Sequence, residues 1–150
     1  MTQVQFYHLT ATPLDRALPK LLEKAVSGGY KILLVTGSDA QAEHLNHMLW
    51  TYDPGSFLPH GTTAGGHAGQ QPILISTTFD APNQANLLAV TNGAIPEHPE
   101  TFERILDIFD GNDQQATENA RSRWKTYKGS GHTISYLKQN QAGGWEKAAT

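Results

Sequence analysis

The sequence predicts a single α/β domain of three layers, in which helices flank a mostly parallel, Rossmann-like sheet of about five strands. Short apolar runs of strand length alternate along the chain with segments whose apolar residues recur at helical spacing. One run, residues 31–36, is apolar through four consecutive positions, which is typical of a strand buried on both faces of a parallel sheet. The length of 150 residues matches one domain.

The first half of the chain predicts a β-α-β unit followed by a helix. Residues 4–9 are prone to form a strand, residues 14–25 carry leucines at helical spacing, and residues 31–36 form the next strand. Pro19 lacks a backbone N–H, so the regular first helix is expected to begin near it. Ser38 and Gln41 then form a capping-box pattern that starts a helix ending near residue 50.

The second half predicts three more strands, at residues 72–76, 86–90 and 104–109. Asp107 interrupts the last strand and is expected to face outward. Asn112 or Asp113 can cap the final helix, which is expected to end at the glycines after residue 128. The domain is therefore expected to span residues 1–138, and residues 139–150, rich in Gln, Ala and Gly, are expected to form a flexible tail.

Composition excludes several classes of protein. The chain has no cysteine, so disulfides, thiolate metal sites and a cysteine nucleophile are absent. No apolar run approaches the length of a membrane span, and the N-terminus does not resemble a secretory signal, so a cytoplasmic protein without a membrane partner is expected. The net charge of −3 argues against broad, sequence-independent binding of nucleic acid.

No segment carries a convincing catalytic or cofactor motif. The glycine-rich residues 61–71 lack the Lys-Ser/Thr of a phosphate loop, and the turn at residues 37–39 lacks dinucleotide-binding spacing. His44 and His47 are one helical turn apart, but no third ligand stands at suitable spacing. We expect no cofactor, no metal and no catalytic residue.

Residues 121–128, RSRWKTYK, carry four cationic and two aromatic side chains within about two helical turns. Helical spacing places three of these cations and one indole on a single face: Arg121, Trp124, Lys125 and Lys128. Such a face suits a ligand that is both acidic and apolar. The alternative is a solvated surface helix whose basic end complements the helix dipole while the indole packs inward.

A second unusual segment, residues 50–60, places three aromatic side chains beside turn residues. Either Trp50 and Phe57 dock on the protein's own core, or they contact another molecule.

Taken together, these segments resemble the chi subunit of bacterial DNA polymerase III. The resemblance rests on residues 4–9 (VQFYHL), residues 56–60 (SFLPH) before a glycine-rich loop, and residues 120–128 (ARSRWKTYK), and it runs to about residue 132. It implies a non-catalytic subunit of a DNA-directed DNA polymerase assembly, associated with the clamp loader. Its expected partners are the acidic C-terminal tail of single-stranded DNA-binding protein, which ends in Pro-Phe, and a small subunit called psi. Contact with DNA would then be indirect.

The resemblance also implies site residues. Arg121 and Trp124 match the family positions closest to the tail, and Lys125 and Lys128 would attract its acidic residues. Phe109 could line the recess for the terminal phenylalanine. The candidates for contact with psi are Trp50, Phe57 and Pro59.

Two other functions remain open from the sequence. One is a nucleotide-binding enzyme that uses the strand-end cleft at residues 37–39 with the loop around His67. The other is direct binding of single-stranded nucleic acid by the basic helix, with Trp124 stacking on a base.

Overall fold

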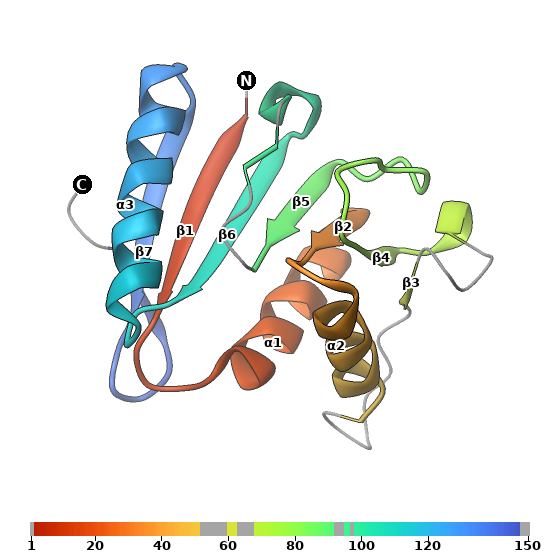
Figure 1. The fold of residues 1–150 in the computed structure, drawn as a ribbon, viewed down its shortest axis with the longest axis horizontal. Coiled ribbons are helices and arrows are strands. Elements are labelled where there is room, and N and C mark those ends of the chain that lie inside the picture. Colours follow the sequence, from red (N-terminus) through yellow and green to blue (C-terminus); the bar gives the residue numbers. More distant parts are fainter. Residues whose placement is uncertain (1, 52–59, 63–67, 92–94, 97, 148–150) are drawn as a thin grey trace.

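The computed structural model describes residues 2–51, 60–62, 68–91, 95–96 and 98–147. Helices lie on both faces of one eight-stranded sheet with the order β3-β4-β2-β5-β6-β1-β7-β8 (Figure 1). The strands are β1 (Gln3–Leu9), β2 (Ile32–Val35), β3 (Gly61–Thr62), β4 (Ile73–Ser76), β5 (Leu87–Val90), β6 (Arg104–Asp110), β7 (Thr133–Gln139) and β8 (Trp145–Lys147). All pairings are parallel except that of β7 with β8. The predicted fold class is confirmed, with more strands than the five expected.

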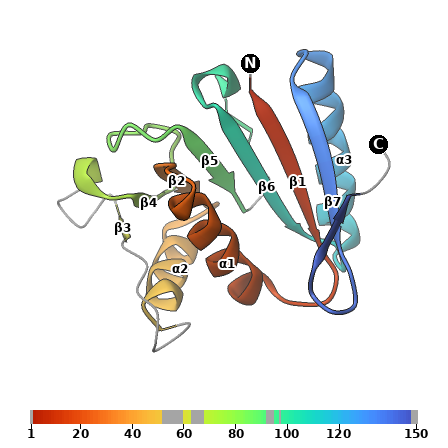
Figure 2. The same ribbon diagram turned by 180° about the vertical axis from the view of Figure 1, so that it is seen from behind.

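Three α-helices form the outer layers: α1 (Leu14–Ser27), α2 (Asp39–Thr51) and α3 (Gln114–Gly129). Helices α1 and α2 cover the β2 side of one face, and α3 lies on the opposite face over β6, β1 and β7 (Figures 1 and 2). None of the helices in the described residues is long and apolar enough to cross a membrane.

Helix α1 begins five residues before Pro19, so the predicted start was wrong. The backbone N–H groups of Arg16 and Ala17 donate to the carbonyl of Pro13, which starts the helix upstream. Pro19 is buried beside Leu18 and Leu22. Burial of its ring in the core offsets the backbone hydrogen bond that proline cannot donate.

The hydrophobic core divides into one cluster on each face of the sheet. The cluster on the α1 side includes Leu22, Ile32 and Leu34, and the cluster on the α3 side includes Phe6, Leu33 and Tyr127. Successive residues of β2 contribute to opposite clusters, which explains its uninterrupted apolar sequence.

The segment predicted to be a flexible tail contributes a strand to the sheet. Trp145–Lys147 pairs antiparallel with β7, and Gln139 at the end of β7 is 4% exposed. The Gln139 Oε1 accepts hydrogen bonds from the backbone N–H groups of Thr10, Ala11 and Thr12 at 3.1, 2.9 and 3.0 Å. One buried amide therefore ties the hairpin to the loop that follows β1.

Replacing Gln139 with Leu is expected to lower the free energy of unfolding by about 1–3 kcal/mol, because three backbone N–H groups lose their acceptor. Urea denaturation followed by circular dichroism measures the change. The matched control is Gln141→Leu, since Gln141 is exposed. Equal stability of the two variants would show that the amide does not anchor the loop.

Candidate protein-interaction site on helix α3

Helix α3 begins at the cap that the sequence predicts. The Asp113 carboxylate accepts hydrogen bonds from the backbone N–H groups of Gln115 and Ala116 at 2.9 and 3.2 Å. The acid thus satisfies two free N–H groups and complements the positive end of the helix dipole. The basic residues follow in the second half of the helix.

One of the four cations of residues 121–128 lies inside the protein. Arg123 is 4% exposed and donates two hydrogen bonds to Asp107, from Nε at 2.6 Å and from Nη2 at 2.9 Å. Asp107, expected to face outward, is 1% exposed, so that prediction was wrong. Burial raises the pKa of the Asp107 carboxyl, and the hydrogen bonds and charge of Arg123 oppose that rise.

The helical spacing of the sequence is consistent with a buried Arg123. Arg123 lies three residues after Ala120 and four before Tyr127, and all three are buried on the side of α3 that faces the sheet. A single acid in an apolar strand is the partner that such an arginine requires.

The four residues predicted to share one face of this helix lie on the flank of α3 nearer β7. Arg121, Lys125 and Lys128 are exposed, and Trp124 is half-buried. The Lys128 Nζ stands 4.6 Å from the centroid of the Trp124 ring, a cation–π contact. Trp124 also packs against the core cluster on the α3 side. The indole is therefore both anchored in the protein and partly accessible.

Two residues missed in the sequence, His8 and Tyr136, join this region. The Phe109 ring is 4% exposed and lies 5.0 Å from the His8 ring and 6.2 Å from the Tyr136 ring, measured between centroids. The His8 Nδ1 is 2.5 Å from the Tyr136 hydroxyl. Adjacent pairing of β6, β1 and β7 brings these rings together. The charge of Arg121 acts on both groups: burial, Lys138 and Arg121 together lower the pKa of His8, and Arg121 opposes the rise that burial causes in the pKa of Tyr136.

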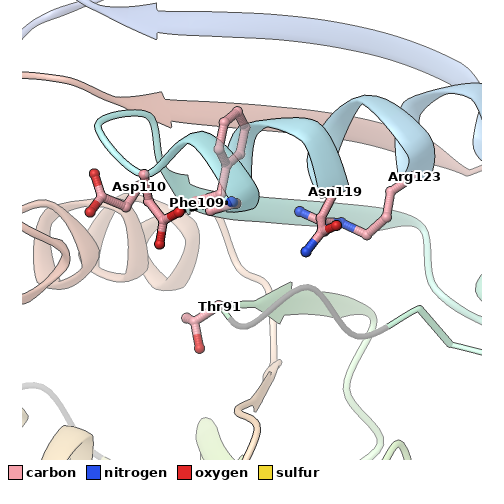
Figure 3. Close-up of a pocket in the computed structure, with 7 residues that line it drawn as sticks. Thr91, Phe109, Asp110, Asn119 and Arg123 are labelled. Atoms are coloured by element: carbon pink, nitrogen blue, oxygen red, sulfur yellow. Dashed lines mark hydrogen bonds between the residues drawn. The ribbon is translucent and has the colours of Figure 1, made fainter.

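On the other flank of α3 lies a pocket of about 230 Å³ at the ends of β5 and β6 (Figure 3). Its lining includes Thr91, Asn119 and Arg123, together with Asp110 and Asp113. Two carboxylates make this pocket unfavourable for an acidic ligand. The Phe109 ring is turned toward β1, where it meets His8 (Figure 3).

His8 should make stability depend on pH. Burial lowers its pKa, the charges of Lys138 and Arg121 lower it further, and Asp110 acts in the opposite direction. The folded protein therefore binds the proton less readily than the unfolded chain does. Stability should be full above the ordinary histidine pKa of about 6.5 and should fall as the pH drops toward the lower folded-state pKa.

Urea denaturation between pH 7.5 and pH 5 measures this effect, with His8→Leu as the comparison. The wild type should lose more stability than the variant over that window. Parallel curves for the two proteins would exclude His8 as the source.

The second segment predicted to contact a partner is residues 50–60, and the structure describes only its two ends. Trp50, at the end of α2, is 53% exposed, and its ring lies 4.7 Å from that of His60. His60 is buried, and its Nε2 is 3.1 Å from the carbonyl oxygen of Asn46. Phe57 and Pro59 lie outside the described residues.

The turn at residues 37–39, considered above as the site of a nucleotide-binding enzyme, forms the N-terminal cap of α2. The Ser38 Oγ accepts a hydrogen bond from the Gln41 N–H at 3.2 Å, and the Gln41 Oε1 accepts one from the Gly37 N–H at 3.2 Å. His67 lies outside the described residues.

The histidines considered as metal ligands do not form a metal site in the described residues. His44 pairs with Asp15 at 2.8 Å, and within the described parts of the chain no three metal-ligating side chains form a group.

Comparison with known proteins identifies the family of the chain. The family model described as "DNA polymerase III chi subunit, HolC" matches residues 1–135. The probable DNA polymerase III subunit chi of Rickettsia prowazekii is 29% identical over 99% of this chain and 93% of its own length. The DNA polymerase III subunit chi of Haemophilus influenzae is 29% identical over 87% of this chain and 93% of its own length. The chain therefore belongs to the DNA polymerase III chi subunit family.

Proposed function

We propose that this chi subunit binds the acidic C-terminal tail of single-stranded DNA-binding protein on the β7 flank of α3. Its family places the protein in DNA polymerase III and in DNA replication. Binding of the tail would link the polymerase, through the clamp loader, to DNA coated with the binding protein. The observation that supports this proposal is the group of exposed cations, Arg121, Lys125 and Lys128, beside the half-buried Trp124.

The cations and the indole on this flank match the acidic residues and the terminal phenylalanine of the tail, respectively. Arg121, Lys125 and Lys128 are exposed and can pair with acidic side chains. Trp124 is fixed by its core contacts and by the Lys128 Nζ, so it offers an aromatic surface that loses little rotational freedom on binding. The terminal phenylalanine can pack against this ring while its carboxylate pairs with Arg121.

A fluorescence-anisotropy titration with a labelled acidic peptide ending in Pro-Phe tests the proposal. We expect a dissociation constant on the order of micromolar that weakens with salt, because exposed ion pairs contribute little free energy each. The C-amidated peptide should bind more weakly because it lacks the terminal charge. Equal binding of the two peptides would contradict recognition of a free C-terminus.

We also propose that the region around Trp50 contacts the psi subunit. An indole more than half exposed at a helix end is a typical anchor for a protein partner. Co-purification with psi should weaken in Trp50→Ala and persist in Trp124→Ala. The reverse pattern would assign the contact to α3.

A further inference from the structure

Within the described part of the chain, half of one sheet face has no helix over it. Helices α1 and α2 cover the β2 side of that face, and α3 lies on the opposite face, so the α1 side of β1, β7 and β8 is uncovered among the described residues (Figure 2). Tyr7 of β1 and Trp145 of β8 pack at the margin of the α1-side core cluster. Leu137 pairs with Tyr7 in register and shares its face. We refer to this surface as the open half-sheet.

Three aromatic side chains lie along the open half-sheet and its border with α1. Tyr7 and Trp145 meet edge to face with their centroids 5.0 Å apart. Tyr30, after α1, lies under the Arg104 guanidinium, whose central carbon is 5.5 Å from the ring centroid. Tyr7 and Tyr30 line one pocket of about 240 Å³. All three rings are half-buried, so each is held by the protein while part of it remains accessible.

The charge beside these rings is positive. Lys24 and Arg104 line the pocket, and its lining contains no acidic residue. Alternation along β8 places Lys147 on the same face as Trp145. The neighbouring side chains on β1, Gln3 and Gln5, are neutral hydrogen-bonding groups, and they contact Arg104 and Tyr7 at 3.0 and 3.3 Å respectively.

We propose that the open half-sheet binds single-stranded nucleic acid, with bases against Tyr30, Tyr7 and Trp145 and phosphates near Lys24, Arg104 and Lys147. Rings spread over a sheet face accept unstacked bases, and cations beside them pair with the backbone. This function goes beyond binding of the protein tail, because the tail site lies on the opposite face of the sheet. It also differs from nucleic-acid binding by the basic helix.

The composition of the surface favours a polynucleotide over an apolar protein partner. The large hydrophobic side chains that are highly exposed within the described residues are Trp50 and Ile95, and neither belongs to the open half-sheet. The surface therefore offers stacking, hydrogen bonds and positive charge but little fully exposed apolar area. A net charge of −3 for the whole chain limits the affinity, so binding should be weak and short in range.

Fluorescence anisotropy of a labelled oligo(dT) strand at low salt tests the proposal on the full chain. The test variants are Lys24→Ala, Arg104→Ala and Tyr30→Leu, and Lys24 is exposed, so its removal leaves the core intact. Loss of the Tyr30 ring should weaken binding about tenfold. With three phosphate contacts, the slope of log K against log salt should be about −2, and each lost cation should reduce it by about 0.7.

Matched measurements separate this site from α3. Arg121→Ala should bind oligo(dT) as the wild type does, and the three test variants should bind the acidic Pro-Phe peptide as the wild type does. A blunt duplex should bind more weakly than the single strand because its bases are stacked. The proposal would be overturned by no binding of oligo(dT) at low salt, by binding insensitive to Lys24→Ala and Tyr30→Leu, or by equal loss in Arg121→Ala. Binding of the acidic peptide to the open half-sheet would also overturn the proposal.

Discussion

Arg123→Ala is expected to lower the free energy of unfolding by about 3–5 kcal/mol, because the substitution leaves the Asp107 carboxylate buried without its partner. Both side chains are almost fully inaccessible, with side-chain exposures of 5% for Arg123 and 1% for Asp107. The pair joins α3 to the middle of β6, so its loss also weakens the support of the helix that carries the proposed tail site. Urea denaturation followed by circular dichroism measures the effect.

Two comparisons make this result specific. The double variant Asp107→Leu with Arg123→Met removes both charges and should recover most of the lost stability, because buried ion pairs are often replaceable by apolar residues of similar volume. Arg121→Ala, at an exposed position on the same helix, should change stability by no more than about 0.5 kcal/mol. A similar small effect for Arg123→Ala would show that water reaches the carboxylate.

Trp124→Ala is expected to weaken binding of the acidic Pro-Phe peptide about tenfold or more, since it removes the ring on which we propose that the terminal phenylalanine packs. It also removes the surface that holds the Lys128 ammonium at 4.6 Å. Titration by fluorescence anisotropy measures the loss. Trp124→Phe keeps an aromatic surface and should bind better than the alanine variant.

The fold of the variant must be checked in the same experiment, because Trp124 packs against the core. Arg121→Ala supplies the control, since Arg121 is exposed and its removal should weaken binding severalfold without loss of stability. Unchanged affinity in both variants would place the tail elsewhere on the protein.

The sequence predicted the elements whose patterns are strong. Strands β2, β4 and β5 are buried at every position and almost entirely apolar, and the Asp113 and Ser38 caps stand where the side-chain rules place them. Strand β7 was missed because its burial is partial and its sequence, TISYLKQ, mixes polar and apolar residues. Its role depends on long-range contacts, such as those of Gln139 with residues 10–12, which no local pattern reveals.

The candidate site was predictable only in part for the same reason. Helical spacing placed Arg121, Trp124 and Lys128 on one face, and the structure has them on one flank of α3. The approach of His8 and Tyr136 depends on the pairing of β1 with β7, across 128 residues of sequence. The burial of Arg123 was not predicted, because charge alone does not distinguish a buried arginine from an exposed one.

Heteronuclear NMR can map the peptide on the protein directly, by titration of the isotope-labelled chain with the free-acid Pro-Phe peptide. If the tail binds α3, amide signals should shift along residues 121–128 and at the adjoining His8 and Tyr136, and the signals of residues 37–39 should stay in place. Shifts centred on residues 37–39 or on the open half-sheet, with those of α3 unmoved, would contradict binding of the tail to α3.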